Sequence, residues 1–270
     1  MIVDCHTHIF PEKIAPKVMQ MNRRNLGLEP YGAGTTPDLL AYMDTAGIDY
    51  AVAFGVAPEG QFVRATNDWL IAQADARLLL FGTITPDFAD WAAEIDRIKT
   101  AGVMGIKFNP LFQDIRPDDR DMYPIYEKLT QEGMFVFFHA GKGSGEETGD
   151  AVRSTPARLR RLHRDHPDLQ LLCAHFGGSG MLEEVLTHLA GTEVYLDTSQ
   201  TPTCKDLDIK VINDLIRRHG TERILYATDY PWARQGGAFG WEYEWLDRLD
   251  LSQEDRECIL GGNAQRLFNL

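Results

Sequence analysis

The sequence predicts a single (β/α)8 TIM-barrel domain that spans residues 1–270. Eight short runs rich in β-branched and aromatic residues recur along the chain, and longer segments with helical spacing separate them. The chain has 270 residues, of which 44% are hydrophobic, so it is long enough to bury one large core. Strands that alternate with helices form a parallel sheet, and the number eight favours closure into a barrel.

The eight expected strands are short apolar runs, from MIVDC at the start to RILYATD near the end. Turn residues and helical segments bound each of them, which is typical of strands in a parallel sheet. They cover residues 1–5, 50–55, 78–84, 102–108, 134–140, 169–175, 193–199 and 223–229.

The segments between the strands carry helical periodicity, with apolar residues every three or four positions, as at Ile95 and Ile98. Pro37 follows Thr36 where one helix begins, and Gly102 and Gly133 lie just past the ends of two others. The expected helices are residues 36–47, 62–76, 90–102, 123–133, 154–166, 180–191 and 204–220.

A doubly wound open sheet is the alternative fold. It would favour a glycine-rich phosphate turn after the first strand, where this chain has CHTHIFP instead. The longest interruption, residues 11–34, follows that strand and is predicted to be a lid over the site or an interface in a homodimer.

Charge and cysteine content narrow the function classes. A net charge of −13 disfavours nucleic acid and anionic membranes as partners. The four cysteines form no CxxC pair, which favours reduced thiols. No run of apolar residues approaches the roughly 20 needed to cross a bilayer, and no signal-like segment opens the chain, so a cytoplasmic location is expected.

Polar residues end several expected strands. His6 and His8 lie one residue apart and share a face of the first strand, because successive side chains alternate. The fourth, fifth, sixth and eighth strands end in Lys107, His139, His175 and Asp229. In a barrel the carboxyl ends of the strands form one rim, so this pattern predicts a site for a divalent ion, zinc first, with manganese or iron open. The other four histidines are expected on helix surfaces: His163, His166, His188 and His219.

The motifs DCHTHIFP, GIKFNP, HAG, AHFGG, YATDYPW and ILGGNAQRLF together resemble the amidohydrolase superfamily, and within it the branch of aminocarboxymuconate semialdehyde decarboxylase. The resemblance implies that His6, His8, His139 and Asp229 hold the metal, and that Asp229 also accepts a proton. It also implies that His175 is a base or polariser beside metal-bound water, or a ligand of a second ion.

Two roles are open for Lys107. The resemblance to two-metal members implies a carboxylated lysine that bridges two ions. The alternative is an ammonium inside the barrel, paired with Asp4 or Asp229.

The expected reaction is hydrolysis of a small, carboxylate-bearing substrate by metal-activated water. Decarboxylation or hydration of an unsaturated or aromatic acid is the alternative, and a catalytically inactive binding barrel is the second alternative. An arginine clamp would hold the carboxylate, and aromatic side chains beside the ligands would line the pocket. The candidates are Arg116, Arg153, Arg234, Phe10, Tyr230 and Trp232.

Overall fold

Eight parallel strands form one sheet in the order of the chain, from β1 to β8. The computed structural model describes residues 1–26, 30–143, 149–199, 208–232 and 246–270. The strands are β1 Val3–His8, β2 Tyr50–Phe54, β3 Leu78–Gly82, β4 Gly105–Phe108, β5 Phe135–Phe138, β6 Leu171–Cys173, β7 Tyr195–Asp197 and β8 Ile224–Leu225. The predicted (β/α)8 barrel is confirmed, and the observed strands are mostly shorter than the predicted runs.

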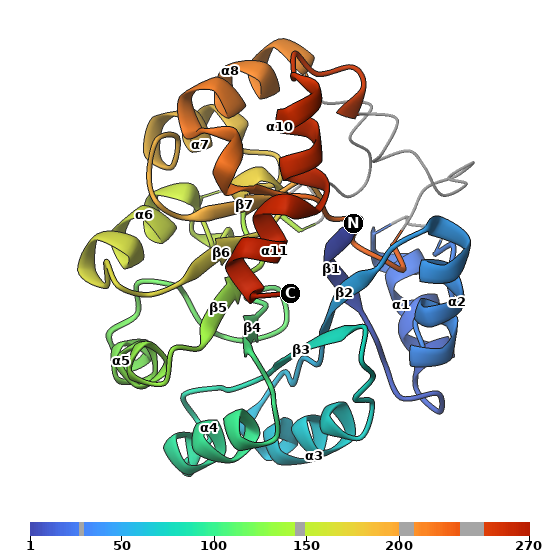
Figure 1. The fold of residues 1–270 in the computed structure, drawn as a ribbon. Helices are drawn as coiled ribbons and strands as arrows, with labels where there is room; N and C mark the ends of the chain where they lie inside the picture. The colour runs from blue at the N-terminus through green and yellow to red at the C-terminus, as the bar shows by residue number, and fades with distance from the viewer. Residues whose placement is uncertain (27–29, 144–148, 200–207, 233–245) are drawn as a thin grey trace.

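Hydrogen bonds between the two ends of the sheet close the ring (Figure 1). The amide of Cys5 donates to the carbonyl of Tyr226 at 2.8 Å, and the amide of His8 donates to the carbonyl of Tyr230 at 2.7 Å. The residues after β8 therefore continue the pairing with β1. This pairing brings Asp229, beyond the short eighth strand, beside the two histidines of the first.

The helices surround the strands, and two of the predicted glycine stops have left-handed backbone, with φ of 88° at Gly102 and 63° at Gly133. The helices are α1 Ala15–Leu26, α2 Thr36–Ala46, α3 Gly60–Ile71, α4 Trp91–Thr100, α5 Tyr123–Gln131, α6 Pro156–Asp165, α7 Leu182–His188, α8 Ile209–His219, α10 Gln253–Glu257 and α11 Asn263–Phe268. Helix α1 lies inside residues 11–34, where the sequence indicated only a long insertion. None of the helices in the described ranges has both the length and the apolar surface to cross a bilayer.

The core has two layers, one between the strands and the outer helices and one inside the ring. Strand alternation puts Phe54, Phe81 and Phe137 into the inner layer. Helix α11 lies over the middle of the ring in Figure 1, and the ring of Phe268 contacts that of Phe135 at 5.1 Å between centroids. Because this helix covers the amino-terminal end of the barrel, the carboxyl ends of the strands remain for the site.

Candidate active site

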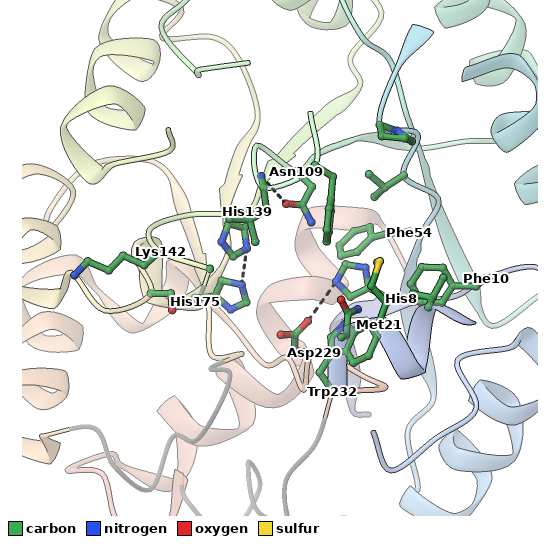
Figure 2. Close-up of a pocket in the computed structure, with 18 of the residues that line it drawn as sticks. His8, Phe10, Met21, Phe54, Asn109, His139, Lys142, His175, Asp229 and Trp232 are labelled. Carbon is green, nitrogen blue, oxygen red and sulfur yellow. Dashed lines mark hydrogen bonds and ion pairs between the residues drawn. The ribbon is translucent and has the colours of Figure 1, made fainter. Parts of the chain in front are cut away.

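The structure brings the predicted metal-binding residues together at the carboxyl ends of the strands (Figure 2). His6 and His8 come from β1, His139 directly follows β5, His175 lies in the short helical turn η3 (His175–Gly177), and Asp229 follows β8. Each is at most 8% exposed. Residues separated by more than 200 positions therefore share one buried polar cluster, as the strand-end argument predicted.

His6, His8 and Asp229 form the tightest set. The Nε2 atoms of the two histidines are 3.1 Å apart, and Asp229 Oδ1 lies 3.3 Å from each of them. One donor atom from each residue falls within 4.8 Å of the others. Two imidazole nitrogens and a carboxylate at such distances match the donors that borderline divalent ions bind.

His139 and His175 form the second half of the cluster. His175 Nε2 lies 3.0 Å from His139 Nδ1, and the other ring nitrogen of His139 is buried without a hydrogen-bond partner among the described residues. Burial lowers the pKa of His139 well below its ordinary value and that of His175 to about 4. Both rings are therefore neutral near pH 7 and can offer a lone pair, and the orphaned nitrogen of His139 fits a bound ion.

Asp197 and Ser199 join the two halves, and neither residue was predicted from the sequence. Asp197 Oδ2 accepts from His6 Nδ1 at 2.7 Å, while its Oδ1 accepts from the backbone amides of His175 at 2.8 Å and Ser199 at 3.0 Å. The hydroxyl of Ser199 lies 3.1 Å from His6 Nδ1 and 3.0 Å from His175 Nδ1. With Nδ1 donating to the carboxylate, His6 presents the lone pair of Nε2 to His8 and Asp229.

Asp197 and Ser199 both lie in the run EVYLDTS, which was predicted to be the seventh strand. Asp197 ends β7, and Ser199 lies two residues further along the chain. Asp197 therefore lies at the carboxyl end of its strand, as the predicted histidines do.

Lys107 is fully buried beside His6. Its Nζ lies 3.4 Å from His6 Nε2 and 4.3 Å from the centroids of both the Phe54 and Phe137 rings. Burial lowers its pKa, and the negative charges of Asp197 and Asp229 oppose that shift. These surroundings fit the interpretation of Lys107 as an ammonium inside the barrel, with Asp197 as a charge partner in addition to Asp229.

The backbone is strained at two of the functional residues. His175 has a φ of 59° and Asp229 a φ of 63°, a region that residues with a Cβ adopt infrequently. Such conformations concentrate where side chains are held for function. Here they occur at two residues that lie beyond the ends of their strands, His175 after β6 and Asp229 after β8.

A cavity of about 310 Å³ opens above this cluster. His8, His139, His175 and Asp229 form the polar part of its lining near the metal-binding residues (Figure 2). Its other walls are mostly apolar: Phe10, Ile14, Val18, Met21, Phe54, Val56, Pro58, Leu111, Phe112 and Trp232. Asn22, Asn109, Lys142, Gly143 and Ser179 complete the lining. Helix α1 supplies Val18, Met21 and Asn22, so part of the insertion forms a wall of the cavity.

The predicted aromatic residues divide. Phe10 and Trp232 line the cavity, with their rings 6.2 Å apart between centroids. Tyr230 does not, which corrects the prediction that it lines the pocket. It is fully buried, and its hydroxyl donates to Asp38. Because it follows Asp229 directly, its side chain points to the other side of the chain, where it packs against Tyr42 at 5.0 Å between ring centroids.

The predicted arginine clamp is not assembled by the described residues. Arg153 donates to the carbonyls of Pro110 and Gln113, both at 3.3 Å, and pairs with Asp114 at 3.0 Å. Neither Arg153 nor Arg116 lines the cavity above the histidines. Arg234 lies outside the described residues.

The expectation that the helical histidines lie on the surface is wrong for two of them. His219 is 2% exposed and His163 is 8% exposed. Both occupy the inner faces of their helices, and His219 Nε2 pairs with the carbonyl of Val194 at 3.0 Å. A position in a helix far from the site therefore does not by itself place a histidine on the surface.

A family model described as Amidohydrolase matches residues 3–270. A gamma-resorcylate decarboxylase from Polaromonas sp. strain JS666 is 23% identical over 286 residues, covering 84% of this chain and 85% of that protein. A 2-keto-4-carboxy-3-hexenedioate hydratase from Sphingobium sp. strain SYK-6 is 24% identical over 216 residues, covering 67% of this chain but only 62% of the hydratase.

The fold also matches solved structures. A dihydroxybenzoic acid decarboxylase from Polaromonas sp. strain JS666, with bound manganese and the inhibitor 2-nitroresorcinol, superposes with a TM-score of 0.73. The identity is 19%, and the match covers 100% of this chain and 97% of that one.

Proposed function

The chain belongs to the amidohydrolase family, and from this membership and the geometry of the site we propose that it is a metal-dependent decarboxylase of aromatic carboxylic acids. The observation that carries the proposal is the cavity itself. Its mostly apolar walls include Phe10, Phe54 and Trp232, and its base is a buried cluster of histidines and Asp229. Apolar walls with a few convergent polar groups suit a planar acid whose carboxylate meets the cluster.

In this proposal His6, His8, His139 and Asp229 hold one divalent ion. Their donors fit manganese or zinc, and manganese is tested first because it is bound in the similar decarboxylase structure. Such an ion would supply a Lewis acid that binds oxygen atoms of the substrate. Asp197 and Ser199 keep the ring of His6 in the orientation and tautomer that a ligand requires.

The chain's own residues move the proton. Loss of CO2 breaks the bond between the ring carbon and the carboxylate, and the bonding electrons stay on that carbon, which takes a proton. Asp229 is the one carboxyl group among the described residues that line the cavity, and we assign to it the transfer of a proton from water to that carbon. Burial lowers the pKa of His175 to about 4, so its ring is neutral and can accept a hydrogen bond from water or substrate in the same cavity as Asp229.

Hydrolysis, the first expectation from the sequence, becomes the second candidate. The relatives described above are decarboxylases and a hydratase. Attack by activated water remains the best use of this cluster if the cavity takes a lactone or an amide rather than an aromatic acid. The inactive barrel and the homodimer stay predictions.

The test is decarboxylation by the purified protein loaded with manganese or, separately, with zinc. Hydroxybenzoic acids would be followed by loss of ultraviolet absorbance and by release of CO2. We expect Asp229→Asn to lower kcat by about a hundredfold or more. Asp168→Asn, the same change at an exposed position, is the control. Hydrolysis of lactones or amides without any release of CO2 would show that the proposal is wrong, and metal-loaded protein that turns over nothing would favour the inactive barrel.

A further inference from the structure

Two carboxamides line the cavity outside the metal-binding cluster. Asn22 comes from α1 and Asn109 directly follows β4, and each is 5% exposed. The side chain of Asn22 has no hydrogen-bond partner in the described part of the chain. No atom of either carboxamide is among the described polar atoms that are both buried and unpaired, so both groups are accessible from the cavity, and a ligand that fills it can satisfy them in place of water.

Asn109 presents a donor. Its Oδ1 accepts from the amide of Leu111 at 3.2 Å, while within the described residues its Nδ2 has no partner. Figure 2 shows the amide of Asn109 above the histidines, on the same side as Phe54. With its oxygen already engaged, the group can offer N–H bonds to an acceptor oxygen.

The loop around Asn109 is fixed before any ligand binds. The amide of Asn109 donates to Gln113 Oε1 at 2.7 Å, and Gln113 Nε2 donates to the carbonyl of Ala57 at 2.9 Å. Gln113 is fully buried. Arg153 binds two carbonyls of this loop, which gives it a structural role in place of the predicted clamp. A donor held this way loses little entropy on binding.

The charged residues of the cavity limit how many carboxylates a bound ligand can have. Among the described lining residues there is no arginine, and the one cation is Lys142. In Figure 2 its side chain extends away from His139 and His175. Within this described part of the lining, a second carboxylate on the ligand would face amides and apolar walls without a paired cation, which is unfavourable.

We propose that Asn109 and Asn22 recognise a neutral oxygen substituent, such as a hydroxyl, on the ring of an aromatic acid with a single carboxylate. The inference rests on the proposed function, because it assumes that the carboxylate meets the metal-binding cluster. It assigns part of the substrate specificity to these two asparagines and predicts that dicarboxylates are not the preferred substrates.

The test is binding rather than turnover. Dissociation constants would be measured by calorimetry on the manganese-loaded protein for benzoate, the three monohydroxybenzoates and isophthalate. We expect at least one hydroxybenzoate to bind about tenfold or more tightly than benzoate, and isophthalate to bind more weakly than that hydroxybenzoate. Asn109→Leu and Asn22→Leu should each reduce the preference for the hydroxyl group, while binding of benzoate stays nearly the same.

Asn109→Asp is the matched variant, because it keeps the shape and replaces the donor with a carboxylate. It should lose the preference as well, and a thermal melt and the metal content of each variant check that it is folded and loaded. An unchanged preference in all three variants would overturn the inference, as would tighter binding of isophthalate or no binding of any benzoate. A preference that vanishes in the variants of a protein that releases no CO2 would support the inference while rejecting decarboxylation.

Discussion

Replacing Asp197 with asparagine should reverse the direction of one hydrogen bond and so disable His6 as a ligand. In the native protein Asp197 Oδ2 accepts from His6 Nδ1 at 2.7 Å. Its Oδ1 is held by the amides of His175 and Ser199, which can only donate. The oxygen of an asparagine would stay with these two amides, and its NH2 group would face His6. Nδ1 would then have to accept, which moves the proton to Nε2.

A protonated Nε2 cannot bind a metal, and this is the atom that faces His8 and Asp229. Changes to the partner of a metal-binding histidine typically lower metal affinity by about 10- to 100-fold, equivalent to about 1.4–2.8 kcal/mol. We expect Asp197→Asn to fall in that range for manganese and zinc. The assay is competition with a chelator at about pH 8, where the Asp197 carboxyl, whose pKa burial raises, is better ionised.

Two controls sharpen the assay. Ser199→Ala removes the hydroxyl near His6 without reversing any bond, so its effect should be smaller. Asp168→Asn makes the same chemical change at an exposed position and should have none. Nitrogen NMR of the histidine rings in metal-free protein reads the tautomer of His6 directly. Native affinity in Asp197→Asn, with the tautomer unchanged, would refute the argument that Asp197 sets the ligand.

Removal of the metal with a chelator should lower the melting temperature, because an ion present at a hundredfold excess over its dissociation constant stabilises the fold by about 2.7 kcal/mol; identical melting curves would contradict a resident ion. In the metal-free protein the lowered pKa of His175 should by itself contribute a loss of about 2 kcal/mol of stability between pH 7 and pH 5, measured by urea unfolding as the difference between the native protein and His175→Gln. The sign follows because burial lowers the pKa of His175 to about 4, so the unfolded chain binds its proton first as the pH falls. Lys107→Met, which keeps the volume of a side chain buried between Phe54 and Phe137, should leave about one ion per chain by elemental analysis; a fall from two ions to one would instead support the carboxylated lysine.

Much of the site could be predicted from strand ends alone. His6, His8, His139, His175 and Asp229 were all selected from their places in short apolar runs, and the structure brings them into one cluster. That succeeded because parallel strands in a barrel end at a common rim, so a one-dimensional position determines which side of the molecule a residue occupies.

Other residues could not be predicted in this way. Asn22 belongs to α1, a helix inside a segment that the sequence indicated only as an insertion. The role of Arg153 depends on which carbonyls lie within reach of its long side chain, and the sequence carries no sign of them. Tyr230 turned away from the cavity because the chain alternates after Asp229, although the sequence placed it beside the ligands.

The sequence by itself determined the barrel, its rim and most of the polar residues at that rim, because periodicity and strand polarity are local properties that adjacent residues encode. Only the tertiary structure decided how those residues are paired: Asp197 with His6, Lys107 between two phenylalanine rings, and two amides in an apolar cavity. These pairings join strands and helices that are distant in sequence. They depend on side-chain directions and on burial, which exist only once the barrel has closed.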